Sequence, residues 1–421
     1  MIDQVVGLKC SICGETYQPG AVEYVCPKHG SDGNLDVQYN YDLIGKRVRQ
    51  DGLANLPGMW RYKTLMPLDP DAALPPLVVG NTPLYRSNRV AGELGLRAVW
   101  FKDDGRNPTA SLKDRASALI VAKAKSEGRT MVTTASTGNA AAALAGLAAS
   151  MDMPSVIFVP ATAPEAKVTQ LLVYGAHVFL VKGTYDDAFE LCLKASGEYG
   201  WLCRNTGYNP YTAEGKKTVS YEICEQLAEQ PGKFSAPDAV VVSVGDGNIL
   251  SGVHKGLKDL LALGWIDHMP RLIGIQAVGS SFLYQAWKSN IDPLTMKPVD
   301  AKTIADSISA GLPRDRVRAM NAVRETEGAY LTVTDQEILD AIPALARATG
   351  IFAEPAASAA YAGLIKAARE GILRPEEAVV TLITGNGLKD VASARKAVGP
   401  AHPIEPDMAE VARVASEIFG A

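Results

Sequence analysis

Residues 97–120 read RAVWFKDDGRNPTASLKDRASALI, and this stretch decides the fold. Its apolar beginning, 97–102, predicts a buried strand, and the turn-forming residues of 103–108 end that strand. Ser111 then precedes a helical pattern of apolar residues from 112 to about 124, and its hydroxyl is a candidate cap for that helix. A strand that leads through a turn into a helix is the repeating unit of a parallel α/β sheet.

Lys113 falls in the first turn of this predicted helix. Free backbone N–H groups and the positive end of the helix dipole collect there, so an ammonium group is poorly placed as a stabilising charge. Such a position tends to lower the pKa of an amine, which a lysine that forms a Schiff base requires. The alternative, on spacing alone, is an exposed lysine with no special role.

The composition predicts a soluble globular protein with two domains or one two-lobed domain. The chain has 421 residues, of which 47% are hydrophobic and 21% charged. A net charge of −4 and a pI near 5.8 argue against nucleic acid or an anionic membrane as a partner. The N-terminus lacks the basic and apolar regions of a secretory signal, and the most apolar run, 140–149, is too short to span a bilayer. We therefore expect a cytoplasmic protein with reduced cysteines.

Cys10, Cys13, Cys26 and His29 have the spacing of a two-knuckle zinc site. Each pair places two ligands on one tight turn, and two turns complete a tetrahedron with no open position for catalysis. We expect a structural Zn²⁺ here; the alternative is a lost metal site that has left its cysteines behind. The module is too small to hold a core unaided.

From residue 97 onward, β-rich runs alternate with alanine-rich helical stretches, which predicts parallel sheets covered by helices on both faces. Further strands are predicted at 130–134, 155–159, 177–181, 239–244, 272–277 and 378–383, and further helices at 138–150, 164–174, 184–197 and 249–263. We divide the chain into a zinc-ribbon-like module at 1–41, a connecting arm at 42–96, a smaller α/β subdomain at 97–205 and a larger one at 206–421.

Three of the predicted strand-to-helix turns have an unusual composition. They are Ser136-Thr137-Gly138-Asn139, Gly245-Asp246-Gly247-Asn248-Ile249 and the segment that begins at Thr384. Such turns gather at the carboxyl ends of parallel strands, where ligands bind. The second turn is a short cup whose N–H groups could hold a phosphate, although it has neither P-loop nor dinucleotide-binding spacing.

Together, six segments resemble the threonine synthase family among the fold type II pyridoxal-phosphate enzymes, which have the fold of the tryptophan synthase β subunit. They are GRNPTASLKDR (105–115), STGN (136–139), NPYTAEGKKT (209–218), VGDGNI (244–249), FAEPA (352–356) and TGNGLKD (384–390). They occur in family order and cover about residues 75–395. Some members also carry an N-terminal zinc knuckle. The resemblance implies two α/β subdomains with parallel sheets.

The resemblance also implies roles for individual residues. Lys113 would hold pyridoxal 5′-phosphate covalently and then move protons as general base and acid. Asn139 would hydrogen-bond the cofactor's phenolic oxygen, the cup at 245–249 would hold its phosphate, and Thr384 would face the pyridine nitrogen. A hydroxyl at that nitrogen suits elimination and replacement at the β or γ carbon. The implied substrate ligands are Ser136, Thr137, Gly138 and Asn209.

Some residues depart from the family pattern. Thr212 stands where we expect an arginine that grips the substrate phosphate, and threonine is a poor substitute for a bidentate guanidinium. Ala140 stands where we expect a threonine, and Gly207 where a serine can stand. Ala110 and Leu112 replace the more usual glycine and phenylalanine beside the lysine.

The implied activity is conversion of O-phosphohomoserine to L-threonine and phosphate, by γ-elimination and β-hydration, in a cytoplasmic homodimer. Arg204, Lys216 or Lys217 could supply the charge missing at Thr212. The second enzyme hypothesis is an ammonia-lyase or β-replacement enzyme that acts on a related amino acid such as threonine or serine. A third hypothesis is a zinc-ribbon interaction protein whose α/β body has lost catalysis, and the presence of Lys113 argues against it.

Overall fold

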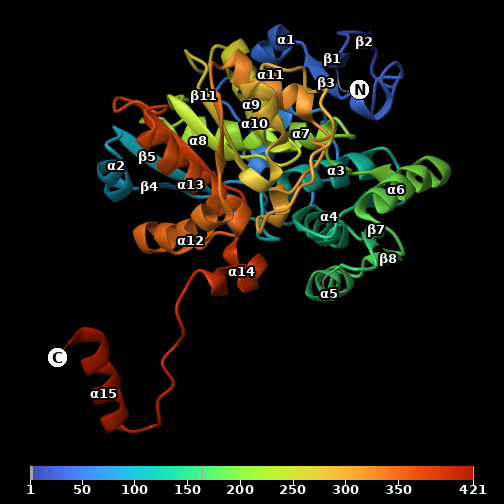
Figure 1. Cartoon of the computed structure of the whole chain (residues 1–421). Coiled ribbons are helices and arrows are strands. Elements are labelled where there is room, and N and C mark those ends of the chain that lie inside the picture. The colour runs from blue at the N-terminus through green and yellow to red at the C-terminus, as the bar shows by residue number, and fades with distance from the viewer. Residues whose placement is uncertain (1–2, 164, 421) are drawn as a thin grey trace.

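Three sheets organise the chain (Figure 1). The computed structural model describes residues 3–163 and 165–420. A three-stranded sheet lies near the N-terminus, and sheets of six and four strands form the body. The two larger sheets confirm the predicted α/β class. In the described part of the chain, no helix is both long enough and apolar enough to cross a membrane.

The six-stranded sheet has the order β12-β11-β10-β13-β5-β4. Its strands are β4 (Leu84–Arg86), β5 (Ala98–Asp103), β10 (Ala239–Ser243), β11 (Arg271–Ala277), β12 (Ala329–Val333) and β13 (Ala378–Ile383). Neighbouring strands run parallel from β12 to β5, and β4 pairs with β5 antiparallel at the edge. The carboxyl ends of β5, β10 and β13 therefore point the same way.

The four-stranded sheet is parallel, with the order β8-β7-β6-β9. Its strands are β6 (Val132–Ala135), β7 (Ser155–Pro160), β8 (His177–Val181) and β9 (Leu202–Cys203). The residues of β6 and β9 are all buried, whereas β8 is an edge strand with exposed Phe179 and Leu180. The strands β6 and β9 thus form the buried part of this sheet, and β8 forms an exposed edge.

Helices cover the larger sheet on both faces. The helices are α1 (Tyr41–Arg47), α2 (Asn88–Leu94), α3 (Lys113–Ser126), α4 (Asn139–Ala149), α5 (Glu165–Val173), α6 (Tyr185–Tyr199), α7 (Tyr211–Lys216), α8 (Thr218–Leu227), α9 (Asn248–Ala262), α10 (Phe282–Lys288), α11 (Arg316–Glu325), α12 (Asp335–Thr349), α13 (Pro355–Arg369), α14 (Val391–Lys396) and α15 (Met408–Phe419). Alternate strand residues face two cores: Val241 belongs to a core that includes residues of α12 and α13, and Val240 to one that includes residues of α8, α9 and α11. Figure 1 shows α15 away from the body at the end of an extended segment.

The N-terminal sheet, of order β2-β1-β3, is antiparallel. Its strands are β1 (Val5–Cys10), β2 (Thr16–Tyr17) and β3 (Leu35–Tyr39), so it ends close to the predicted boundary at 41. The following segment, predicted as a connecting arm at 42–96, is more ordered than that name implies. It contains a 3₁₀ helix, Gly58–Leu65, whose Trp60 and Tyr62 are buried in the core of the body.

Several sequence predictions need correction. The division of 97–205 from 206–421 does not follow the sheets, because β5 pairs with β13 along its whole length and joins the larger sheet. Ser111 does not cap α3: its hydroxyl is buried without a hydrogen-bond partner, and Leu112 is the residue before the helix. The helix predicted from residue 164 is α5, and residue 164 itself lies outside the described residues.

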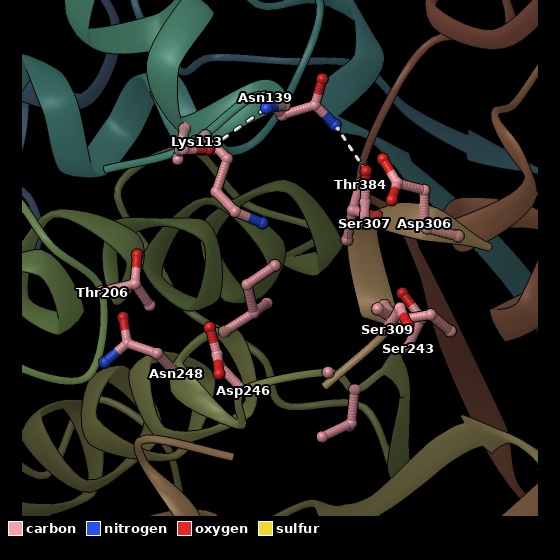
Figure 2. A pocket seen from close by; sticks show the side chains of 18 of the residues that line it. Lys113, Asn139, Thr206, Ser243, Asp246, Asn248, Asp306, Ser307, Ser309 and Thr384 are labelled. Atoms are coloured by element: carbon pink, nitrogen blue, oxygen red, sulfur yellow. Dashed lines mark hydrogen bonds between the residues drawn. The ribbon is translucent and has the colours of Figure 1, made fainter. Parts of the chain in front are cut away.

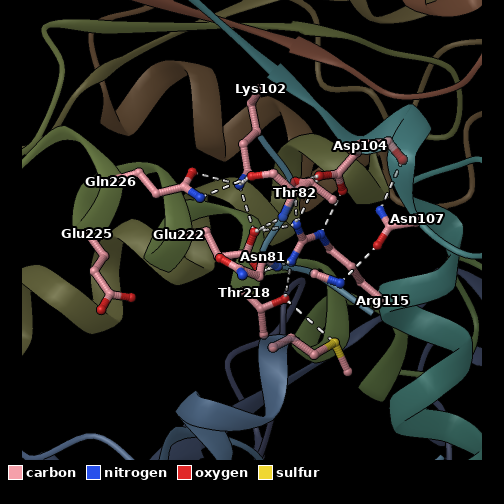
Figure 3. A network of polar contacts seen from close by, with 12 residues as sticks. Asn81, Thr82, Lys102, Asp104, Asn107, Arg115, Thr218, Glu222, Glu225 and Gln226 are labelled. Atoms are coloured by element: carbon pink, nitrogen blue, oxygen red, sulfur yellow. Dashed lines mark hydrogen bonds and ion pairs between the residues drawn. The ribbon is translucent and has the colours of Figure 1, made fainter. Parts of the chain in front are cut away.

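A buried ionic network fixes α3 against β5 and α8 (Figure 3). The Arg115 guanidinium donates to Asp104 at 2.6 and 2.9 Å and to Glu222 at 2.7 and 2.8 Å. Lys102 Nζ donates to Glu222 Oε2 at 2.7 Å. Burial alone would raise the pKa of Glu222, but Arg115 and Lys102 lower it to about 2. This network sets the position of the first turn of α3.

Glu222→Ala is expected to lower the free energy of unfolding by about 3–5 kcal/mol, because it leaves Lys102 and Arg115 buried with an uncompensated charge. Urea unfolding followed by circular dichroism measures the change. Glu93→Ala is the control, since Glu93 pairs with Arg89 at 2.9 Å on the exposed surface, and its loss is expected to cost less than about 0.5 kcal/mol. Equal effects of the two substitutions would contradict the role given to the network.

Candidate active site

One cavity of about 460 Å³ lies where the strand ends of the two larger sheets meet (Figure 2). It is lined by all of the predicted cofactor- and substrate-binding residues except Asn209. These are Lys113, Ser136, Thr137, Gly138, Asn139, Gly245, Asp246, Gly247, Asn248, Ile249 and Thr384. Segments up to about 270 residues apart in the chain are thus brought to one place, as expected for the carboxyl ends of parallel strands.

Lys113, the first residue of α3, extends into this cavity (Figure 2). Its helix is held to the end of β13, because the Leu112 amide donates to the Thr384 carbonyl at 2.9 Å. Burial, with the nearby charge of Arg204, lowers the pKa of Lys113 to about 8. Near physiological pH, Lys113 is therefore a neutral, nucleophilic amine in a substantial fraction of the molecules.

The turn before Lys113 contains Ala110, one of the residues that depart from the family pattern. Ala110 has φ 66°, a left-handed conformation that glycine adopts most easily. Its carbonyl accepts from the Asn386 amide at 3.1 Å, and its amide donates to the Asn107 carbonyl at 2.8 Å. The surrounding backbone thus imposes the conformation, and alanine tolerates it with some strain.

The cup between β10 and α9 has the form of an anion site. Gly247 has φ 90°, and a β-carbon there would lie 2.6 Å from Ala319 Cβ, so the position requires glycine. Among the described residues, no side chain caps the start of α9. The free N–H groups of its first turn and the positive end of its dipole therefore remain available to a phosphate. The Asp315 amide, which donates to the Asp246 carbonyl at 2.9 Å, fixes the cup from outside.

Asn139 begins α4 and donates across the cavity to the other subdomain. Its Nδ2 atom donates to Glu354 Oε1 at 2.8 Å and to Ser307 Oγ at 3.4 Å. Burial raises the pKa of Glu354 above its ordinary value. Glu354 also supports the turn after Thr384, because its amide donates to the Gly385 carbonyl at 3.1 Å.

The segment Ser136–Gly138, which precedes α4, is open to the cavity. A β-carbon built on Gly138 would meet no other atom within 4 Å. Gly138 precedes the first helical residue and no side chain caps α4, so the first N–H groups of this eleven-residue helix are free for an anion. This arrangement suits a carboxylate.

Asn209 is not among the described residues that line the cavity. Its Nδ2 atom donates to the Cys203 carbonyl at 2.7 Å, and its Oδ1 accepts from the Tyr211 amide at 2.9 Å. Asn209 thus holds the loop between β9 and α7. Its predicted contact with substrate remains a prediction.

The four residues of the predicted zinc site lie together in the N-terminal module. The ligand atoms of Cys10, Cys13, Cys26 and His29 are all within 4.8 Å of one another. Cys10 and Cys26 are buried, and His29 Nδ1 lies 3.5 Å from Cys26 Sγ. This module touches the active-site loop, because Asn34 Nδ2 donates to the Gly207 carbonyl.

Comparison with known proteins identifies the family. Residues 76–385 match the family described as pyridoxal-phosphate dependent enzyme. Threonine synthase of Methanocaldococcus jannaschii is 36% identical over 413 residues, which cover 97% of this chain and 99% of that protein. Threonine synthase of Methanosarcina acetivorans is 38% identical over 385 residues, 91% of this chain and 92% of that protein. The chain belongs to the threonine synthase family of pyridoxal-phosphate-dependent enzymes.

Solved structures of other activities share the fold. A threonine deaminase of Solanum lycopersicum superposes with a TM-score of 0.65 at 21% identity, over 83% of this chain and 97% of that one. A fungal L-serine ammonia-lyase of Rhizomucor miehei gives 0.63 at 21% identity, over 75% and 96%. At this identity the likeness concerns the fold alone.

Two further departures from the threonine synthase pattern have a structural explanation. Gly207 has φ 72°, and a β-carbon there would lie 2.4 Å from Arg314 Cβ, so the serine of other members would not fit. Thr212 is fully buried, and its hydroxyl donates to the Asn209 carbonyl at 2.8 Å and to Asn248 Oδ1 at 3.2 Å. These contacts give the threonine hydroxyl a structural role in joining α7 to the start of α9.

Sequence reasoning assigned no role to several cavity residues. Glu354 lies in a family motif, and that motif was the only signal for it. Ser307 and Ser309 come from the loop between α10 and α11, where neither apolar periodicity nor a strand-to-helix turn indicates a site. Tyr185 reaches the cavity from the start of α6. These contacts arise from tertiary packing that no local pattern reveals.

Proposed function

We propose that this protein acts as a threonine synthase, which converts O-phosphohomoserine and water to L-threonine and phosphate. The observation that carries the proposal is the single cavity in which Lys113, Asn139, Thr384 and the cup at 245–249 come together. The 36% identity to a threonine synthase over nearly the whole of both chains supports the same activity.

The cavity residues fit pyridoxal phosphate. The free N–H groups at the start of α9 suit its phosphate, and the Lys113 amine suits covalent attachment of its aldehyde. Asn139 Nδ2 would donate to its phenolic oxygen, and the Thr384 hydroxyl would face its ring nitrogen. When bound, the cofactor would supply an electron sink for charge that develops on the substrate.

Lys113 would move the protons of the reaction. Its pKa of about 8 places the amine between its charged and neutral forms near neutral pH, so it can both accept and donate a proton. The free N–H groups at the start of α4 would bind the substrate carboxylate and orient the substrate's carbon chain. Asn209 would act through the loop that it holds.

A product assay on the purified holoenzyme tests this function. O-phosphohomoserine and L-threonine are supplied in separate reactions, and phosphate, threonine and ammonia are measured. We expect phosphate and threonine in equal amounts from the first substrate and no ammonia from the second. Ammonia from threonine, without phosphate from O-phosphohomoserine, would indicate the ammonia-lyase that the absence of an arginine at Thr212 favours.

Lys113→Ala is expected to lower the rate of phosphate release by at least about 10³-fold, because it removes both the covalent attachment and the proton carrier. The matched control is Lys125→Ala, which changes an exposed lysine in the last turn of the same helix. Comparable activity of both variants would contradict the assignment of Lys113.

We also propose that Cys10, Cys13, Cys26 and His29 bind a structural Zn²⁺. Three thiolates and an imidazole form a common closed ligand set, and their atoms are already close together. The module carries Tyr39, whose hydroxyl donates to Glu214 of α7, and Asn34, which contacts Gly207. The zinc would thus stabilise a module that packs against the active-site loop.

Cys10→Ser is expected to remove most of the zinc, measured by atomic absorption, and to lower the melting temperature by several degrees. Binding of pyridoxal phosphate, followed by its absorption spectrum at low temperature, should remain. Cys224→Ser is the control, because Cys224 is buried in α8 and is not one of the four clustered ligand residues. Full zinc content in the Cys10 variant would contradict the ligand assignment.

Two remaining features are proposed from the family resemblance. We propose a homodimer in the cytoplasm. None of the six cysteines, all of which lie in the described residues, forms a disulfide, which suits a reducing compartment.

A further inference from the structure

Two buried cations, Arg204 and Lys216, line the cavity without a carboxylate partner. Arg204 donates to the neutral hydroxyls of Ser117 at 3.2 Å and Thr206 at 2.5 Å, and its Nη2 atom is buried without any partner. Lys216 Nζ donates to the neutral amide oxygen of Asn248. None of the ion pairs formed within 3–163 and 165–420 includes either side chain.

Arg115 and Lys217, by contrast, are deeply buried cations that carboxylates neutralise. Arg115 contacts Asp104 and Glu222 at 2.6 and 2.7 Å. Lys217, the neighbour of Lys216, lies 2.6 Å from Glu214 and 2.7 Å from Asp259. Lys217 is therefore committed to structure and does not supply a free charge to the cavity.

A positive charge on Arg204 or Lys216 is unfavourable, because no carboxylate of the described residues forms an ion pair with either side chain. Burial lowers the pKa of Arg204 to about 10. Burial, together with Arg204 and Lys113, lowers the pKa of Lys216 well below its ordinary value. A buried charge is costly unless a counter-charge neutralises it. Two such cations on one cavity wall would be neutralised by an anion with two negative charges.

We propose that Arg204 and Lys216 bind the phosphate group of the substrate, an inference that rests on the proposed function. Figure 2 shows Thr206 and Asn248, the residues that the two cations contact, on the side of the cavity away from Thr384 and Ser307. Asn248 belongs to the cup at 245–249, so the cations lie beside the N–H groups that suit the cofactor's own phosphate. The two cations add positive charge next to that cup, and this charge suits a second phosphate group.

In this chain, α7 supplies the positive charge from Lys216 and not from the arginine that the family pattern has at Thr212. Lys216 is four residues after Thr212, so both side chains lie on one face of α7, and both contact Asn248 Oδ1. The cation is thus supplied one turn further along the same helix. Arg204 adds a guanidinium from the end of β9. When the C–O bond at the γ carbon breaks, its electron pair leaves on the phosphate, and both cations stabilise that charge.

Arg204→Gln and Lys216→Gln test this inference in the holoenzyme. We expect kcat/KM for O-phosphohomoserine to fall by about 10- to 100-fold in each, as for the loss of a charge-assisted hydrogen bond. The dissociation constant of inorganic phosphate, measured by calorimetry, should rise by a similar factor. Binding of L-threonine, which carries no phosphate, and of the cofactor should change by less than about 2-fold. Arg204→Lys should recover part of the affinity, because it retains the charge without the planar fork.

Arg49→Gln serves as the control, because Arg49 is exposed and lies outside the cavity. Unchanged kcat/KM and phosphate affinity in both cavity variants would overturn the inference. Loss of cofactor affinity equal to the loss of phosphate affinity would also overturn it, since the cations would then serve the cofactor. If the wild type binds inorganic phosphate through Arg204 but releases none from O-phosphohomoserine, the proposed function fails while the phosphate site stands.

Discussion

The buried guanidinium of Arg115 is the contact on which the active site depends. It joins Asp104, at the end of β5, to Glu222 in α8, and it lies two residues after Lys113. Removal of these charges from water is compensated only because both carboxylates are bound at short distances. Since the Leu112 amide also bonds to the Thr384 carbonyl, Lys113 is fixed relative to β5, β13 and α8 at once. Because Lys113 is held in this way, its side chain needs no large movement to reach a ligand bound in the cavity.

The protein uses buried cations in two different ways. Arg115 and Lys217 are saturated by carboxylates and hold helices together. Arg204 and Lys216 contact only neutral groups and face the cavity, where an anionic ligand can complete their environment. In the proposed site, the free energy that burial of these charges costs the protein would be recovered as binding free energy when an anion binds.

The sequence predicts the strand-to-helix turns because their glycine and polar residues follow short apolar runs, and parallel topology brings such turns together. These turns, together with the family motifs, predict Lys113 and Asn139 as site residues. The contact of Asn139 with Glu354 spans 215 residues and arises from packing of two subdomains, so no local pattern contains it. Lys216 and Lys217 are adjacent lysines, so the sequence does not distinguish them. Their roles differ because the tertiary structure places a carboxylate beside Lys217 and a neutral amide beside Lys216.

Reduction of the holoenzyme with borohydride, followed by peptide mass spectrometry, tests the central claim most directly. The treatment makes the bond between a lysine and the cofactor's aldehyde permanent, so the modified peptide identifies the lysine. We expect one pyridoxyl group, on Lys113, in the peptide that begins α3. Modification of Lys216, the other lysine of this cavity, or an unmodified Lys113 in catalytically active protein, would contradict it.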